Sequence, residues 1–90
     1  GLFRPKDNIT YDDVAKMLYA GVRKKHIPAQ GDISEMKNVV SDDVADDVKY
    51  AVYQLIKLGV IDDTVSFKSG EAAMNKDIAV MFYNFLQLIH

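Results

Sequence analysis

The sequence contains no cysteine, no excess of basic residues and no apolar stretch long enough to cross a membrane. Without cysteine, disulfide bonds, thiol catalysis, iron–sulfur clusters and thiolate zinc sites are excluded. An extracellular location is not excluded, because a domain with an adequate core folds without disulfide bridges. The longest unbroken apolar run is Ile78–Tyr83, whereas a membrane-spanning helix needs roughly 18 residues.

Charge is nearly balanced along the chain. Eleven Lys and Arg stand against 13 Asp and Glu, which gives a formal net charge of −2. Nucleic-acid binders usually carry a basic excess, because neutralisation of phosphates supplies most of their affinity. The balance therefore argues against a nucleic-acid partner.

The 90 residues are 49% hydrophobic, which indicates one globular domain with a thin core, since a chain of this size buries about 60–65% of its unfolded surface. Such a body is small for a complete enzyme, which needs a deep cleft as well as a core. The sequence starts at Gly1-Leu2-Phe3, in the middle of a sequence pattern, and no signal peptide is recognised. We therefore expect a fragment of a larger protein.

The first helix is predicted from Thr10. Thr10 and Asp13 have the spacing of a capping box, and apolar residues follow at three- and four-residue intervals. Arg23-Lys24-Lys25-His26 place cations at the negative end of the helix dipole, and Pro28 ends the pattern.

Two further helices are predicted. Residues 28–38 connect the first two, with one short helical turn around Ser34–Lys37. The second helix runs from about Ser41, as its N-cap, to Leu58, and Gly59 fits the left-handed residue after its end.

The third predicted helix runs from Asn75, as its cap, to Leu88, after a polar turn and a short extended piece around Val65–Phe67. Its apolar residues cover more than one stripe, so it is either central in the core or part of an interface. Three main helices with short helical or extended connectors predict a small all-α domain.

The first and third predicted helices repeat each other. Phe3 and Phe67 are 64 residues apart, and at that offset the motif Asp-(Val/Ile)-Ala-x-Met-(Leu/Phe)-Tyr occurs at 13–19 and again at 77–83. Agreement in both order and spacing indicates an internal repeat.

The repeat resembles the S-layer homology family. Phe3 to Leu18 resembles the second half of such a repeat, which reads Phe-x-Pro and then Ile-Thr-Arg-Ala-Glu-Phe-Ala-x-Met-Leu. Ser41 to Ile61 resembles the first half, and Phe67 to Leu88 a second copy of the second half. The resemblance divides the single domain, 1–90, into a half repeat at 3–27, a connector at 28–38 and a complete repeat at 39–90.

The resemblance implies a non-catalytic helical module, located outside the cell, that binds secondary cell-wall polysaccharide of bacteria. Such a module would target a larger secreted, surface or phage lysin protein to the wall. Repeats of this family usually occur in threes around a pseudo-threefold axis, with ligand grooves between neighbours. No cofactor, metal or membrane partner is implied.

Two departures from the family bear on the ligand. The arginine that follows threonine in the family is Tyr11 here and Asn75 in the second copy, and the tryptophan of the family falls at Asp47. Tyr11 could stack on a sugar ring while its hydroxyl forms a hydrogen bond. Alternatively, Tyr11 is a first-turn surface residue and Asn75 only a helix cap. The predicted polymer-binding residues are Tyr11, Arg4, Lys6, Asp42, Asp47 and Asn75.

Two charged runs have alternative interpretations. Asp42–Asp47 holds four carboxylates that could attract calcium, but the Asp-x-Asp-x-Asp-Gly spacing is absent and first-turn aspartates already favour the helix dipole. Arg23–His26 could contact an anionic polymer, although cations at the end of a helix are the commoner explanation.

Catalytic patterns are missing from the sequence: it has no Ser/His/Asp spacing on credible elements, no glycine-rich phosphate loop and no His-x-x-x-His. We therefore predict a cell-wall-binding module and not an enzyme. The alternative is a structural or oligomerisation module in which Tyr, Phe and Met faces pair with another chain. A homodimer would give the half repeat a neighbour.

Overall fold

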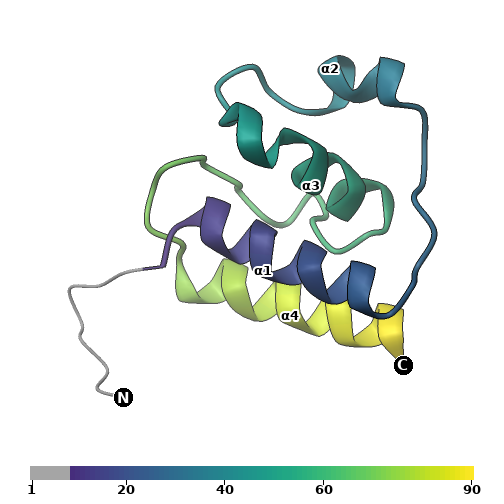
Figure 1. The fold of residues 1–90 in the computed structure, drawn as a ribbon. Helices are drawn as coiled ribbons and strands as arrows, with labels where there is room; N and C mark the ends of the chain where they lie inside the picture. Colours follow the sequence, from purple (N-terminus) through teal and green to yellow (C-terminus); the bar gives the residue numbers. More distant parts are fainter. Residues whose placement is uncertain (1–8) are drawn as a thin grey trace.

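In the computed structural model, residues 9–90 are described and form a stack of helices in which α1 lies between α3 and α4 (Figure 1). In chain order the elements are α1 (Tyr11–Lys24), the 3-10 helix η1 (Ile33–Glu35), α2 (Met36–Val39), α3 (Asp46–Lys57) and α4 (Asn75–Ile89). No strand occurs within residues 9–90. The all-α prediction is confirmed, and the short helical turn predicted in the connector is present as η1 and α2.

The capping box predicted at the start of α1 is present. The hydroxyl of Thr10 accepts a hydrogen bond from the Asp13 N–H at 3.1 Å, and the Asp13 carboxylate accepts one from the Thr10 N–H at 3.2 Å. Val14, Leu18 and Val22 form the buried stripe of the helix. Local sequence thus determines both where α1 begins and which side it buries.

α3 begins later than predicted. Ser41 is not its N-cap, because the helix starts at Asp46, after Ala45. The Ser41 hydroxyl bonds instead to Asp43 in the preceding turn. The N–H of Ala45 is satisfied by the Ser69 hydroxyl at 3.0 Å, from 24 residues away. A distant side chain, rather than the local pattern, therefore supports the start of α3.

The core lies between α1, α3 and the segment that follows α3. Gly59, with φ at 85°, turns the chain after α3 as predicted. The buried residues of the core are aliphatic or aromatic: Tyr11, Val14, Ala15, Leu18, Val22, Val40, Val44, Val48, Val52, Tyr53, Leu55, Val60, Ile61, Val65 and Met81.

α4 lies on the outside of the stack (Figure 1). Only Asp77 and Met81 of this helix are buried. It contacts α1 but not α3, so of the two predicted alternatives a central position in the core is excluded, and a position in an interface stays a prediction. Its N-cap is Met74, and Asn75 is its first residue rather than its cap. No helix in residues 9–90 is long and apolar enough to span a membrane.

The segments that precede α1 and α4 meet in a short antiparallel pairing. The Tyr11 N–H donates to the carbonyl of Glu71 at 3.0 Å, and the Ala73 N–H donates to the carbonyl of Ile9 at 2.8 Å. The bridge between Thr10 and Ala72 lies at the centre of this pairing. The two copies of the repeat are therefore held side by side at their helix starts.

Two side chains of α3 hold the connector between α1 and α3. Gln54, buried, accepts a hydrogen bond from the Gln30 N–H at 2.8 Å and donates to the Gln30 carbonyl at 2.9 Å. The Tyr53 hydroxyl lies 2.9 Å from the Asp32 carbonyl and 2.7 Å from the Glu35 carboxylate. The backbone at Gly31, where φ is 74°, passes close to the Tyr53 hydroxyl.

Gly31→Ala is expected to lower the free energy of unfolding by about 2–3 kcal/mol. The added Cβ would lie 2.1 Å from the Tyr53 hydroxyl oxygen, in addition to the strain of a positive φ. Gly70→Ala is the matched control, because its φ of 82° is similar but nothing lies within 4 Å of its Cβ. Urea denaturation measures both variants, and equal losses would contradict the close approach of Tyr53.

Candidate interaction surfaces

Tyr11, the predicted sugar-stacking residue, is 1% exposed. Its ring packs against Phe67, with the ring centroids 5.4 Å apart and the planes at 57°. Its hydroxyl donates to the carboxylate of Asp77 and accepts from the Met74 N–H at 3.3 Å. An enclosed ring cannot stack on a sugar, so this prediction is wrong, and so is the alternative of a surface residue.

The Tyr11–Asp77 pair joins α1 to α4 in a buried environment. Burial, together with the neighbouring Asp77 carboxylate, raises the pKa of the Tyr11 phenol. Asp77 is itself 1% exposed, and its second carboxylate oxygen has no hydrogen-bond partner among residues 9–90. Tyr11 is therefore the donor on which this buried carboxylate depends.

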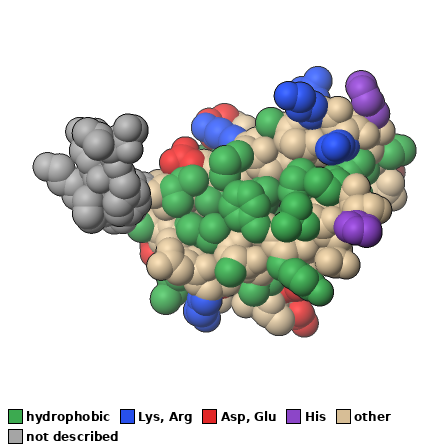
Figure 2. Space-filling model, turned by 90° about the horizontal axis from the view of Figure 1, so that it is seen from below, with side chains coloured by type: hydrophobic (Ala, Val, Ile, Leu, Met, Phe, Trp, Pro, Cys, Tyr) green, Lys and Arg blue, Asp and Glu red, His purple; other side chains and the backbone are tan. Residues whose placement is uncertain are grey.

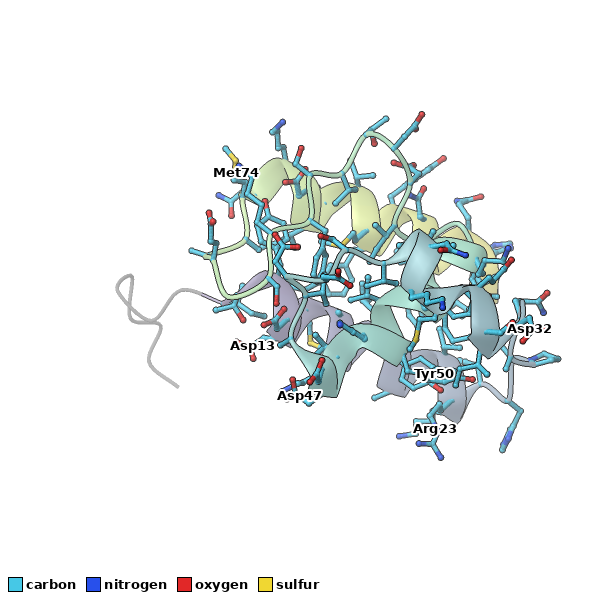
Figure 3. All side chains as sticks on the ribbon, turned by 90° about the horizontal axis from the view of Figure 1, so that it is seen from above. Asp13, Arg23, Asp32, Asp47, Tyr50 and Met74 are labelled. Carbon is cyan, nitrogen blue, oxygen red and sulfur yellow. The ribbon has the colours of Figure 1, made fainter. Side chains whose placement is uncertain are left out.

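The other predicted polymer-binding residues are dispersed. Asp42 and Asn75 are exposed, and Asp47 pairs with Lys16 of α1 at 3.2 Å. Figure 3 shows Met74, which immediately precedes Asn75, at the upper edge of the view and Asp47 at the lower edge. Arg4 and Lys6 lie outside the described residues. The structure brings Tyr11 to the start of α4 but does not gather the described members of the set into one site.

Residues of both charged runs lie at helix ends, where their charges are favourable to the helix dipole. Arg23 and Lys24 occupy the last turn of α1. Asp46 and Asp47 occupy the first turn of α3, and Asp46 pairs with Lys49 at 3.3 Å. Within residues 9–90, no three His, Asp or Glu side chains are grouped so that they could hold a metal ion.

An apolar surface, which we call the α4 face, is formed by Ala79, Phe82, Tyr83 and Leu86. These residues recur at three- and four-residue spacing, so they lie on one side of the helix. Tyr83 is 62% and Leu86 55% exposed. Figure 2, which views the molecule from the α4 side, shows apolar side chains in a broad band with charged groups at its margins.

The internal repeat explains the composition of this surface. Val14, Leu18 and Val22 of α1 correspond, at the offset of 64 residues, to Ile78, Phe82 and Leu86 of α4. In α1 these positions are buried. In α4 they are half-buried or exposed. Within the described residues, the same apolar positions are thus buried in one copy and only partly covered in the other, where Ile78 and Phe82 pack against the core and Leu86 is exposed.

A cavity of about 480 Å³ lies beside α3, and no residue of α4 lines it. Its walls come from the end of α2 and the turn after it, from α3 and from the segment after α3. Most lining residues are apolar: Val39, Val40, Val44, Val52, Ile56, Ile61, Val65 and Phe67. The polar lining residues are Ser41, Asp62 and Asp63. No pattern in the sequence predicts this cavity, because its three walls are separated along the chain.

Two carboxylates near this cavity are held in their ionised form. Asp62 accepts hydrogen bonds from the hydroxyl and the N–H of Thr64, the latter at 2.9 Å, and from the Asn84 amide at 3.0 Å. These bonds lower the pKa of Asp62, the Thr64 hydroxyl first. The Ser41 hydroxyl likewise lowers the pKa of Asp43. The cavity rim is therefore negative at neutral pH.

No protein-family model, curated protein or solved structure matches this chain. The resemblance to S-layer homology repeats stays a prediction from sequence.

Tyr11→Phe is expected to lower the free energy of unfolding by about 2 kcal/mol, because the buried Asp77 carboxylate loses its donor. Tyr83→Phe is the control, since the Tyr83 side chain is exposed, and both variants are compared at a low protein concentration so that association through α4 does not contribute. Urea denaturation at neutral pH compares the two, and a Tyr11→Phe protein as stable as Tyr83→Phe would contradict the role of the hydroxyl.

The stability of Tyr11→Phe can also be compared with that of wild type at alkaline pH. The pKa of Tyr11 is raised above 10.0, its ordinary value. Its contribution to stability is therefore present below that pH and lost as pH rises towards the folded-state pKa. We expect wild type to lose stability more steeply than Tyr11→Phe above about pH 10.

Proposed function

We propose that this chain is a non-catalytic assembly module that associates with a second copy of itself through the α4 face. One observation carries the proposal: an outer helix has no charged residue from Ile78 to Ile89 and exposes Tyr83 by 62% and Leu86 by 55%. Outer helices of monomers normally carry polar residues towards solvent. Aromatic residues with few charges are typical of the buried centre of an interface.

The sizes of the residues on the α4 face suit pairing with a second copy. Two α4 helices packed antiparallel, around a twofold axis near Phe82 and Tyr83, place Ala79 of one copy opposite Leu86 of the other. A small side chain opposite a large one lets two helices approach closely. The absence of charge from the face also removes like-charge repulsion between identical surfaces.

Charges at the ends of α4 fit the same arrangement. Lys76 is exposed in the first turn of α4 and makes no ion pair with another described residue. In an antiparallel pair it lies beside the C-terminal end of the other α4, where the helix dipole is negative. An antiparallel pair is therefore favoured over a parallel one, in which the two lysines would lie together.

The size of the face sets the expected affinity. α4 has 15 residues, so it is about 22 Å long. A stable interface buries about 800 Å² per partner, which is a substantial part of the 6035 Å² surface. One helix face lies near the lower limit, and we expect a dissociation constant on the order of micromolar.

Sedimentation equilibrium over a concentration series tests the association. We expect wild type to form dimers and Leu86→Glu to remain monomeric, because a charge would be buried in the interface. Ile33→Glu is the matched control, since Ile33 is 66% exposed on η1, away from α4. Monomeric wild type throughout, or loss of dimers in both variants, would contradict the proposal.

Single-cysteine variants test the orientation in the same experiment, because the chain has no native cysteine. A mixture of Ala79→Cys and Leu86→Cys is expected to form a mixed disulfide dimer, whereas Ala79→Cys alone forms little. Efficient crosslinking of Ala79→Cys with itself would show a parallel pair and overturn the antiparallel arrangement while leaving association intact.

Binding of cell-wall polysaccharide is the second function we propose, with the chain acting outside the cell. Its support is the internal repeat, whose copies lie side by side as α1 and α4 (Figure 1). Burial of Tyr11 removes the predicted stacking ring, which leaves Asp42, Asp47 and Asn75 as the described candidates.

A pull-down on Gram-positive cell walls tests this second function. We expect retention on intact walls and loss on walls stripped of their polymer. Asn75→Ala is expected to weaken retention, and Leu86→Glu to leave it unchanged, since the two residues belong to different proposed surfaces. Equal retention on intact and stripped walls would contradict polymer binding.

A further inference from the structure

We propose that the 480 Å³ cavity beside α3 is a docking site for a segment of a partner protein that carries large apolar side chains next to a lysine or arginine. The cavity shares no residue with the α4 face. A segment bound in the cavity would therefore contact none of the residues proposed for self-association.

The floor of the cavity is apolar and buried. Val40, Val44, Val52 and Ile61 line it, and each is less than 10% exposed. Protein interiors are packed with few voids larger than a water molecule, whereas this space lies in the size range of sites that hold organic groups. Filling it with apolar side chains would remove from water their own surface and that of the less buried lining residues Val39, Ile56 and Phe67.

The rim of the cavity is acidic. Asp62 and Asp63 line it directly, and Asp42 and Asp43 follow Ser41, which also lines it. No lysine or arginine is among the lining residues.

The ion pairs among residues 9–90 use Asp46, Asp47 and Glu35, and none involves a carboxylate of this rim. A cationic group beside the apolar anchor would supply the missing complement. The acidic rim therefore favours a segment that carries a basic side chain.

The arrangement fits a protein segment better than a small molecule. Small-molecule sites place a few polar groups so that they converge on the ligand inside the pocket. Here Ser41 and Asp63 are exposed and Asp62 is half-buried, while the floor is aliphatic. An apolar centre surrounded by an exposed polar rim is the arrangement of protein–protein contacts.

NMR titration of the ¹⁵N-labelled chain with short capped peptides tests the proposal. Acetyl-Lys-Leu-Phe-Arg-amide is expected to shift the amide signals of Val44, Ile61 and Val65, with a dissociation constant on the order of millimolar. Acetyl-Glu-Leu-Phe-Glu-amide, which reverses the charge, and acetyl-Lys-Gly-Gly-Arg-amide, which removes the apolar anchors, are expected to bind at least several-fold more weakly.

Asp63→Lys is expected to weaken the basic peptide about threefold, because it reverses one rim charge. Glu71→Lys is the control, since it makes the same charge change at an exposed residue outside the cavity. The proposal is overturned if all three peptides bind alike, if the shifted signals lie elsewhere, or if both variants weaken binding equally. Phenethylammonium binding as tightly as the basic peptide would also overturn it, in favour of a small-molecule site.

Discussion

The hydrogen bond from the Tyr11 hydroxyl to the Asp77 carboxylate is the contact that fixes how α4 is placed. It joins the starts of α1 and α4 across 66 residues of sequence, inside a region where both side chains are 1% exposed. A buried carboxylate without its donor is costly, so α4 is held in the orientation that keeps Asp77 inside. The backbone pairing of Thr10 with Ala72 supports the same placement.

This placement determines what α4 exposes. With Asp77 and Met81 directed into the molecule, the opposite side of the helix carries Ala79, Tyr83 and Leu86 to the surface. Both helices of the repeat, α1 and α4, have an apolar side. Other described residues bury the apolar side of α1, but Ala79, Tyr83 and Leu86 of α4 stay exposed. The cavity beside α3 differs in chemistry, because its apolar floor is bordered by carboxylates. An uncharged face and an acid-bordered cavity suit different partners.

Local sequence predicted the features that local physics controls. The capping box at Thr10 and Asp13 and the left-handed Gly59 are present where they were expected. The start of α3 was misplaced because Ser41 bonds to Asp43 in the preceding turn, while the N–H of Ala45, the residue before the helix, is bonded by Ser69 from a distant segment. The repeat equated Tyr11 with Asn75, yet only Tyr11 is buried, since its partners lie in a distant segment that no spacing rule identifies. The cavity was not predicted, because three segments separated along the chain form it and no local pattern links them.

The central claim, that the α4 face is covered by a second copy, is tested most directly by hydroxyl-radical footprinting of the wild-type chain at low and high concentration. Tyr83 and Leu86 are predicted to lose reactivity as concentration rises, while Ile33, which is 66% exposed on η1, keeps its reactivity. Unchanged reactivity of Tyr83 and Leu86 across the whole range would contradict the account.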